Sequence, residues 1–238
     1  GSGFLPGISG TTLGSTGSAS TQVQAMCYRI NITNDSSIKV PFPQPASYDP
    51  LNYELLGRHA ALAGAGWTTL ADIITIFGYA SIKQDVLNHC PMSIDYIHPE
   101  STEYITATRA RRTEIEANAK NYILGLLKFI QTDTRIPAAV RTNVATYGFC
   151  SDEWVWNGNF PPQIYVRCGR RLVGDFVLKE TDITAQNAFT DQIAYGYYAV
   201  DSHHVQRVYT GGAVKNEGKV AGAAYVGAKL PYRVLSPK

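Results

Sequence analysis

The segment Ser101–Thr132 constrains the fold most, because it carries the strongest helical periodicity in this chain of 238 residues. Apolar side chains recur there at spacings of three, four and seven residues, which places them on one face of a helix. They are Tyr104, Ile115, Ala119, Tyr122, Ile123, Leu126, Leu127 and Ile130. The pattern predicts one long helix, or two helices with a break near Thr108, packed against other apolar elements.

Three further helices are predicted from local signals. Asp49 precedes Pro50, a cap followed by the proline typical of a first helical position, so a helix should run from about Leu51 to Ala63 and stop at Gly64. Pro137 and a closing Gly148 bracket a second helix in the same way. The segment Cys168–Glu180 places Leu172, Val173, Phe176 and Val177 on one side and predicts a third.

Strand-forming residues lie at the two ends of the chain. Near alternation of apolar residues over Gln22–Thr33 predicts a half-buried strand, and aromatic, β-branched stretches predict others from Ile193 to Val200 and from Val205 to Tyr209. Residues 1–21, rich in Gly, Ser and Thr, are interpreted as an entry loop. The prediction is an α+β fold: one domain over residues 22–238, with sequence-distant strands covered by a helical insertion at about 51–180.

Charge and hydropathy exclude some classes of protein. The 21 basic and 19 acidic residues give a formal charge of only +2, which argues against a nucleic-acid partner. The longest apolar stretches fall far short of the roughly 20 residues that cross a bilayer, so no membrane span is expected. The sequence starts without Met and is interpreted as a piece of a longer polypeptide. Two glycosylation sequons, at Asn31 and Asn34, weakly favour a secretory route.

Four cysteines, Cys27, Cys90, Cys150 and Cys168, lie far apart without Cys-x-x-Cys spacing. They therefore indicate neither a zinc site nor a redox motif, and their disulfide state stays open. The triplet Asn88-His89-Cys90 could suggest a nucleophile with its base, but this is a weak signal. Gly64-Ala65-Gly66 lacks the preceding strand of a dinucleotide fingerprint and is interpreted as a helix stop.

Two polar clusters are candidate sites. Arg167, Arg170 and Arg171 would share one face of the third predicted helix and could clamp a carboxylate or phosphate, although a solvated basic face is the simpler interpretation. In the run Asp201–Arg207, an extended backbone would point His203 to one face and His204 with Gln206 to the other. Imidazoles titrate near neutral pH and could transfer a proton. No third ligand supports a metal, so no metal site is predicted.

A set of short motifs is spread along the whole chain. They are Gly1-Ser2-Gly3-Phe4-Leu5-Pro6-Gly7-Ile8, Val23–Arg29, Pro41-Phe42-Pro43, Tyr48-Asp49-Pro50, Tyr53–Leu56, Gly125-Leu126-Leu127, Ile136-Pro137, Asp152-Glu153, Asn157-Gly158, Gln163–Arg167, Arg170-Arg171, Asp201–Arg207, Asn216-Glu217-Gly218, Pro231-Tyr232-Arg233 and Ser236-Pro237-Lys238. Together these motifs resemble those of the FAD-dependent oxidoreductases of the glutathione-reductase-like flavoprotein superfamily. The sequence departs from the family's pattern at His89 and at Cys168-Gly169.

The resemblance implies FAD in the complete protein and a small-molecule substrate. The sequence shows no strand, glycine-rich turn and helix of the kind that holds the FAD pyrophosphate, so we expect this chain to form the substrate-side domain, to contact the FAD-binding domain of the same protein, and not to hold FAD alone.

From their chemistry, candidate site residues fall into three groups. His203, His204 and Arg171 are predicted to be catalytic, whereas Arg167, Arg170, Gln206 and Arg207 would face the cofactor. The predicted substrate-binding residues are Gln163, Tyr165, Asn216 and Glu217. One alternative is a non-catalytic binding or structural module derived from a flavoprotein without its FAD domain. A second alternative is a metal-dependent hydrolase that uses His203 and His204.

Overall fold

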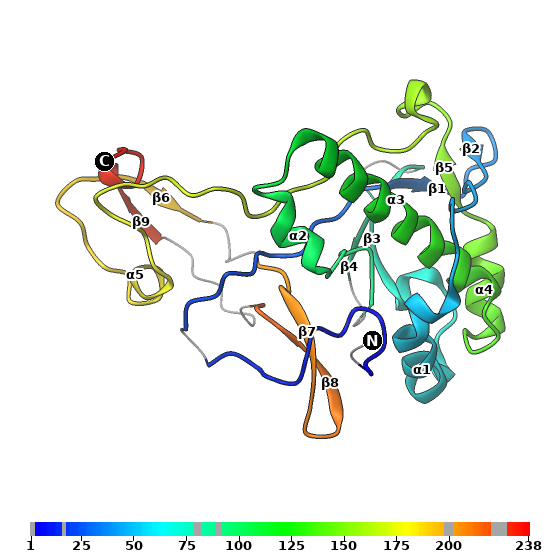
Figure 1. Cartoon of the computed structure of the whole chain (residues 1–238). Coiled ribbons are helices and arrows are strands. Elements are labelled where there is room, and N and C mark those ends of the chain that lie inside the picture. The colour runs from blue at the N-terminus through cyan, green and yellow to red at the C-terminus, as the bar shows by residue number, and fades with distance from the viewer. Residues whose placement is uncertain (1–2, 16–17, 79–81, 89–91, 198–201, 220–227) are drawn as a thin grey trace.

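The computed structural model describes residues 3–15, 18–78, 82–88, 92–197, 202–219 and 228–238. It contains a main body, built largely from the first two thirds of the chain, and a smaller C-terminal lobe joined to it by extended segments (Figure 1). In chain order the helices and strands are β1 (Asn31–Thr33), β2 (Lys39–Val40), α1 (Glu54–Ala63), β3 (Ile74–Gly78), β4 (Gln84–Asn88), α2 (Pro99–Tyr104), α3 (Arg109–Thr132), α4 (Ala138–Ala145), β5 (Gly148–Cys150), α5 (Glu180–Thr184), β6 (Gln192–Gly196), β7 (Gln206–Thr210), β8 (Ala213–Glu217) and β9 (Ala228–Pro231).

The body is a five-stranded sheet with helices packed on it. Its strand order is β2-β5-β1-β4-β3, and each neighbouring pair is antiparallel. The longest helix, α3, crosses in front of the sheet in Figure 1. Its buried side chains, including Ile123, Leu126 and Phe129, belong to the same apolar cluster as Ile32 and Phe149 of the sheet. The fold is therefore α+β, as the sequence predicts.

The helical predictions for the body are confirmed. The predicted break near Thr108 separates α2 from α3, because Thr108 is extended (ψ 162°) and its hydroxyl accepts a hydrogen bond from the Arg111 amide as an N-cap. The Asp49 carboxylate likewise caps a short 3₁₀ turn, Pro50–Tyr53, that leads into α1. Among the described residues, no helix is both long and apolar enough to cross a membrane.

The helix predicted over Cys168–Glu180 is wrong. These residues run extended, and a helix of five residues, α5, starts only at Glu180. The apolar residues that suggested the helix, Leu172, Val173 and Val177, are exposed, so no partner surface supports a helical face. Pairing within the lobe takes precedence instead, since Gly174 makes a bridge with Pro237.

The strand predictions are confirmed only in part. Within Gln22–Thr33 only β1 is a regular strand, and Met26 and Cys27 make single bridges to Tyr96 and Tyr165. β6 and β7 lie where strands were predicted, although the expected continuation from Tyr198 to Val200 falls outside the described residues. Gly148, expected to close a helix, starts β5 instead. An added Cβ there would collide with the backbone oxygen of Val40, so the close approach of β2 and β5 requires glycine.

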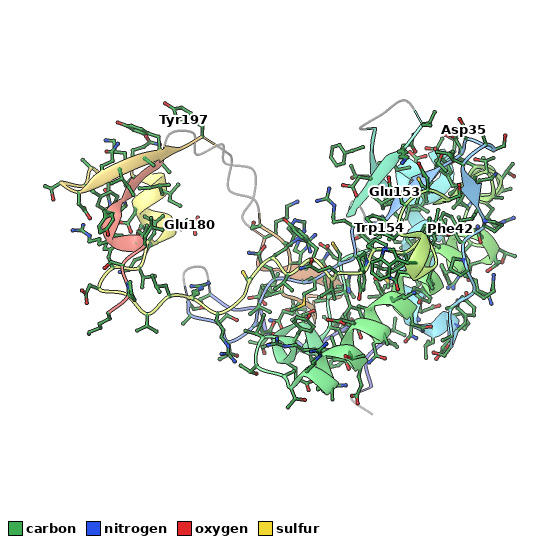
Figure 2. All side chains as sticks on the ribbon, turned by 90° about the horizontal axis from the view of Figure 1, so that it is seen from above. Asp35, Phe42, Glu153, Trp154, Glu180 and Tyr197 are labelled. Atoms are coloured by element: carbon green, nitrogen blue, oxygen red, sulfur yellow. The ribbon has the colours of Figure 1, made fainter. Side chains whose placement is uncertain are left out.

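The lobe consists of α5, β6 and β9. β6 pairs with β9, and the Tyr232 amide donates to the Asp191 carbonyl at 2.8 Å. Phe176 contacts Phe189 edge-to-face, and the Arg233 guanidinium lies 4.7 Å from the Phe176 ring centroid. In Figure 2, Glu180 and Tyr197 mark the lobe, apart from Phe42 and Trp154 of the body.

Candidate functional site

The candidate site is organised by the extended segment 24–27, to which three distant parts of the chain bind. The Tyr96 amide donates to the Met26 carbonyl at 2.8 Å, and the Tyr165 amide donates to the Cys27 carbonyl at 2.7 Å. The Ala25 amide donates to the His204 carbonyl at 2.9 Å. Backbone bonding to one short segment therefore brings together residues near positions 95, 167 and 203.

Asp95 lies at the centre of this arrangement. Its carboxylate is 2.9 Å from Arg167 Nη2 and 2.8 Å from His203 Nδ1, and its side chain is only 2% exposed. The Arg167 guanidinium also donates to the Ala25 carbonyl, and the His203 amide donates to Gln24 Oε1 at 2.6 Å. A buried carboxylate costs free energy unless it is paired, so these contacts hold His203 on the body.

The carboxylate also fixes the state of the His203 ring. An ionised carboxylate can only accept hydrogen bonds, so the ring nitrogen that faces Asp95 must carry a proton. The neutral imidazole is then protonated at Nδ1, and Nε2 is its basic nitrogen. Asp95 and His203 thus form an oriented pair that can exchange a proton at Nε2.

Arg207 is the most deeply buried arginine of this region. The residue is 2% exposed, and the main effect of that burial is to lower the pKa of its guanidinium. It hydrogen-bonds Tyr122 of α3, whose own pKa is raised by burial. Asp95 also interacts electrostatically with Arg207, so the Asp95–His203 pair is coupled to β7.

A cavity of about 290 Å³ adjoins Arg207. It is lined by Pro6, Gly7, Asn52, Tyr53, Met92, Tyr96, Ile97, His98, Asn118, Asn121, Tyr122 and Arg207. The walls come from the N-terminal loop, the 3₁₀ turn Pro50–Tyr53, the segment before α2, α3 and β7. Burial lowers the pKa of His98, so its ring is neutral near pH 7.

The three predicted arginines do not form one clamp. Arg167 pairs with Asp95 and, together with His203, forms the Asp95 cluster (Asp95, Arg167 and His203). Arg170 and Arg171 are instead exposed on the extended segment that leads to the lobe. The predicted helix would have aligned all three, and without that helix they diverge. The basic face expected from their spacing is therefore absent.

Gln163 and Tyr165 lie at a different depression, with Arg29 and Trp154. The Tyr165 ring is covered by two guanidinium groups, those of Arg29 at 5.8 Å and Arg167 at 5.2 Å from its centroid. The structure therefore separates these two predicted substrate-binding residues from the Arg207 cavity.

Gln206 and Glu217 bond to one another across the hairpin of β7 and β8, with the Gln206 amide as donor. The Glu217 carboxylate also accepts from the Gly14 amide at 2.6 Å, and Gln22 donates to Gln206 at 2.9 Å. These groups fasten the N-terminal segment to the hairpin. Asn216 lies opposite Arg207 in the hairpin register, and Asn216 and Glu217 end β8.

His204 is partly buried, and this burial is the main reason why its pKa is lowered. Asp201, His89 and Cys90 lie outside the described residues. Cys27 is buried, which raises its thiol pKa to about 11 and makes it a poor nucleophile at neutral pH. The described part of the chain contains no group of three or more metal-ligating side chains.

Asp95, Tyr122 and His98 were not among the site residues predicted from the sequence. A single carboxylate within the otherwise apolar run Ile94–Ile97 was the available signal for Asp95, because an isolated buried acid requires a partner. Tyr122 fits the apolar face of the predicted helix, and its periodicity gives no sign that its hydroxyl donates to the Ser93 carbonyl at 2.8 Å.

Comparisons with known proteins define the family. No curated protein and no solved structure matches the chain. Residues 7–238, from the N-terminal loop through the Arg207 strand to the lobe, match the sequence model of the family described as FAD dependent oxidoreductase. The chain belongs to the FAD dependent oxidoreductase family.

Proposed function

We propose that this chain forms the substrate-side part of an FAD-dependent oxidoreductase, with the Asp95 cluster and the Arg207 cavity as the place where a small substrate is held. The observation that carries this proposal is the convergence of Asp95, Arg167 and His203 from three distant segments into one buried charged cluster. Such clusters of titratable groups beside a cavity are typical of functional sites. Bound FAD would supply the redox chemistry of such an enzyme.

The described residues do not fit the pyrophosphate of FAD. A dinucleotide site needs a parallel strand, a glycine-rich turn and a helix N-terminus in succession. Every pairing between the described strands is antiparallel, and Gly64-Ala65-Gly66 follows the end of α1. We therefore assign the holding of FAD to another part of the polypeptide and derive no step through it.

Within this proposal the residues of the chain have distinct roles. Asp95 fixes the His203 tautomer, and Arg167 offsets the carboxylate charge. His203 exchanges a proton with the substrate at Nε2. Arg207 supplies positive charge to the cavity. Asp95 and Arg167 are positioning residues, because they act through His203.

A non-catalytic binding module is the second candidate. It is favoured by the exposed aromatic and aliphatic side chains of the C-terminal lobe, which resemble a protein-contacting surface. These side chains are Leu172, Val173, Ile193, Tyr195, Tyr197, Tyr232 and Leu235.

The experiment that separates the two candidates compares the 238-residue chain with a polypeptide that also carries the flavin-binding part. We expect the chain alone to stay colourless after incubation with FAD, and the longer polypeptide to retain flavin. In the longer polypeptide, His203→Gln should slow flavin reduction by substrate about 10²-fold or more, at unchanged flavin content. The conservative variant Arg109→Gln, on the exposed start of α3, serves as the control.

Stoichiometric FAD binding by the chain alone would contradict the assignment of the pyrophosphate site. An unchanged rate of flavin reduction in His203→Gln would contradict the role of the histidine. A longer polypeptide that binds no flavin would favour the non-catalytic module.

A further inference from the structure

The Arg207 cavity is built from parts of the chain that lie far apart in sequence. The N-terminal loop forms one wall because the Ser9 amide donates to the Arg207 carbonyl at 2.8 Å and the Tyr209 amide donates to the Gly10 carbonyl at 2.8 Å. α3 supplies the opposite wall through Asn118 and Tyr122. A volume of about 290 Å³ is at the lower end for ligand sites, so a ligand would be small.

Gly7 allows the backbone to approach the guanidinium. Its φ is +82°, a backbone conformation that residues with a Cβ rarely adopt. A Cβ added at this position would lie 3.4 Å from Arg207 Nη1. The loop can therefore pass close to Arg207 without a side chain over the charge.

The charge of the lining is one-sided. Among the described residues that line the cavity, Arg207 alone carries a full charge, and none is a carboxylate. Burial lowers the pKa of Arg207, which reflects the cost of a charged guanidinium away from water. A carboxylate in the cavity would add charge-assisted hydrogen bonds to the guanidinium, and the described lining contains no carboxylate that would repel it.

Most neutral polar groups of the lining already have protein partners. Glu100 accepts from the Tyr96 hydroxyl at 2.7 Å and from Asn118 at 3.0 Å, and its charge is offset by Arg111 at 2.8 Å. Asn121 is held by the backbone of Ser47. These bonds make the walls rigid, and Arg207 adds the positive charge toward which an anionic ligand would be oriented.

His98 adds a hydrogen-bond donor at the edge of the cavity. Its Nδ1 accepts from the Glu100 amide at 3.3 Å, so the neutral ring carries its proton on Nε2. The ring stacks on Tyr96 with centroids 5.0 Å apart. Tyr53, Met92 and Ile97, all buried, complete an aromatic and aliphatic side.

We infer that this cavity binds a small organic acid whose carboxylate pairs with Arg207 and whose carbon skeleton lies against Tyr53, Tyr96 and Met92. A guanidinium holds a carboxylate through two parallel hydrogen bonds, and the apolar side favours an organic acid over an inorganic anion. The inference rests on the proposed function in one respect: the bound acid is taken to be the substrate.

Binding to the 238-residue chain tests the inference without any flavin. The probes are phenylacetate, its uncharged amide phenylacetamide, and inorganic phosphate, compared at constant ionic strength by calorimetry and by amide chemical shifts. We expect phenylacetate to bind with a Kd of about 1 mM or lower, at least about tenfold more tightly than either other probe. The shifted amides should include those of Gly7, Asn118 and Arg207.

Absence of phenylacetate binding would overturn the inference, as would equal binding of phenylacetamide. Phosphate binding as tight as phenylacetate binding would overturn the assignment to an organic acid. Shifts confined to other residues would overturn the location. These outcomes use the unchanged chain, so they do not depend on the stability of a variant.

Variants sharpen the result. Arg207→Gln should weaken phenylacetate binding at least about tenfold, and Arg207→Lys should recover only part of it, because an ammonium lacks the planar fork. Arg109→Gln removes the same charge from an exposed site and should bind as tightly as the wild type. An Arg207→Gln chain that folds and keeps full affinity would contradict the inference.

Two results separate the inference that the cavity binds an organic acid from the proposal that the chain is part of an oxidoreductase. Loss of acid binding with intact, His203-dependent flavin reduction in the longer polypeptide would remove only the substrate class. Acid binding in a polypeptide that takes up no flavin would leave the site and remove the oxidoreductase role.

Discussion

The body and the C-terminal lobe differ in how much apolar surface they bury. The main core cluster draws all its residues from positions 26–164, and many of them, such as Phe129 and Phe149, have no exposed surface. Of the described residues after Ile164, only Arg207, Val208, Ala228 and Pro231 are buried, while Ile193, Tyr195 and Tyr197 of the lobe are more than half exposed. The body therefore has a core of its own, and the lobe relies on surface contacts within itself.

This difference indicates which part of the molecule determines stability and how the candidate site depends on it. Burial of apolar area is the main source of folding free energy, so the body should control global unfolding. Regions with few buried contacts open locally at low cost. The Asp95 cluster lies where the C-terminal segment meets the body, so its geometry depends on the body's stability and on the attachment of the residues around His203.

The largest expected effect comes from truncating a phenylalanine in the body. Phe129→Ala removes a fully buried ring that packs on Tyr53, and should lower the free energy of unfolding by about 3–5 kcal/mol. The matched change in the lobe, Phe176→Ala, removes contacts with Phe189 and Arg233 but should shift the main transition by less than about 1 kcal/mol.

Chemical denaturation followed by circular dichroism measures both variants. Equal losses of stability would show that the lobe and the body unfold as one unit and would remove the distinction between them.

A smaller effect is expected from filling space between α3 and the segment before α1. The Cβ of Gly125→Ala would overlap the Tyr53 hydroxyl, which donates to the Tyr122 carbonyl at 2.9 Å. The overlap should cost about 1–3 kcal/mol of unfolding free energy. Gly66→Ala is the control, since an added Cβ there meets no atom within 4 Å and should leave stability unchanged or slightly higher. Equal thermal midpoints for the two variants would mean that the body tolerates overpacking and is less tightly packed than described.

The helical part of the body could be predicted from sequence, because its signals are local. Caps such as Asp49 and Thr108 act within one turn, and the apolar period of α3 reports its buried face directly. The segment Cys168–Glu180 has the same kind of apolar period, but its apolar residues do not pack against a core, and it forms no helix. Periodicity alone cannot show whether a partner surface exists.

The candidate site could be predicted only in pieces. Arg167 and His203 were both predicted as site residues, yet the carboxylate that joins them comes from Asp95, more than 70 positions away from Arg167 in sequence. Arg170 and Arg171 were grouped with Arg167 because of helical spacing, and the extended backbone separates them. Convergence through single bridges to Met26 and Cys27 leaves no periodic signal in the sequence.

The tautomer of His203 shows whether Asp95 organises the candidate site. Nitrogen chemical shifts of the ring, assigned by comparison with His203→Gln, distinguish a proton on Nδ1 from one on Nε2 at a pH at which the ring is neutral. Because Asp95 faces Nδ1 at 2.8 Å, we expect a proton held on Nδ1 and a basic Nε2. A proton on Nε2, or a ring that averages between both forms, would contradict the Asp95 cluster as the organising feature of this chain.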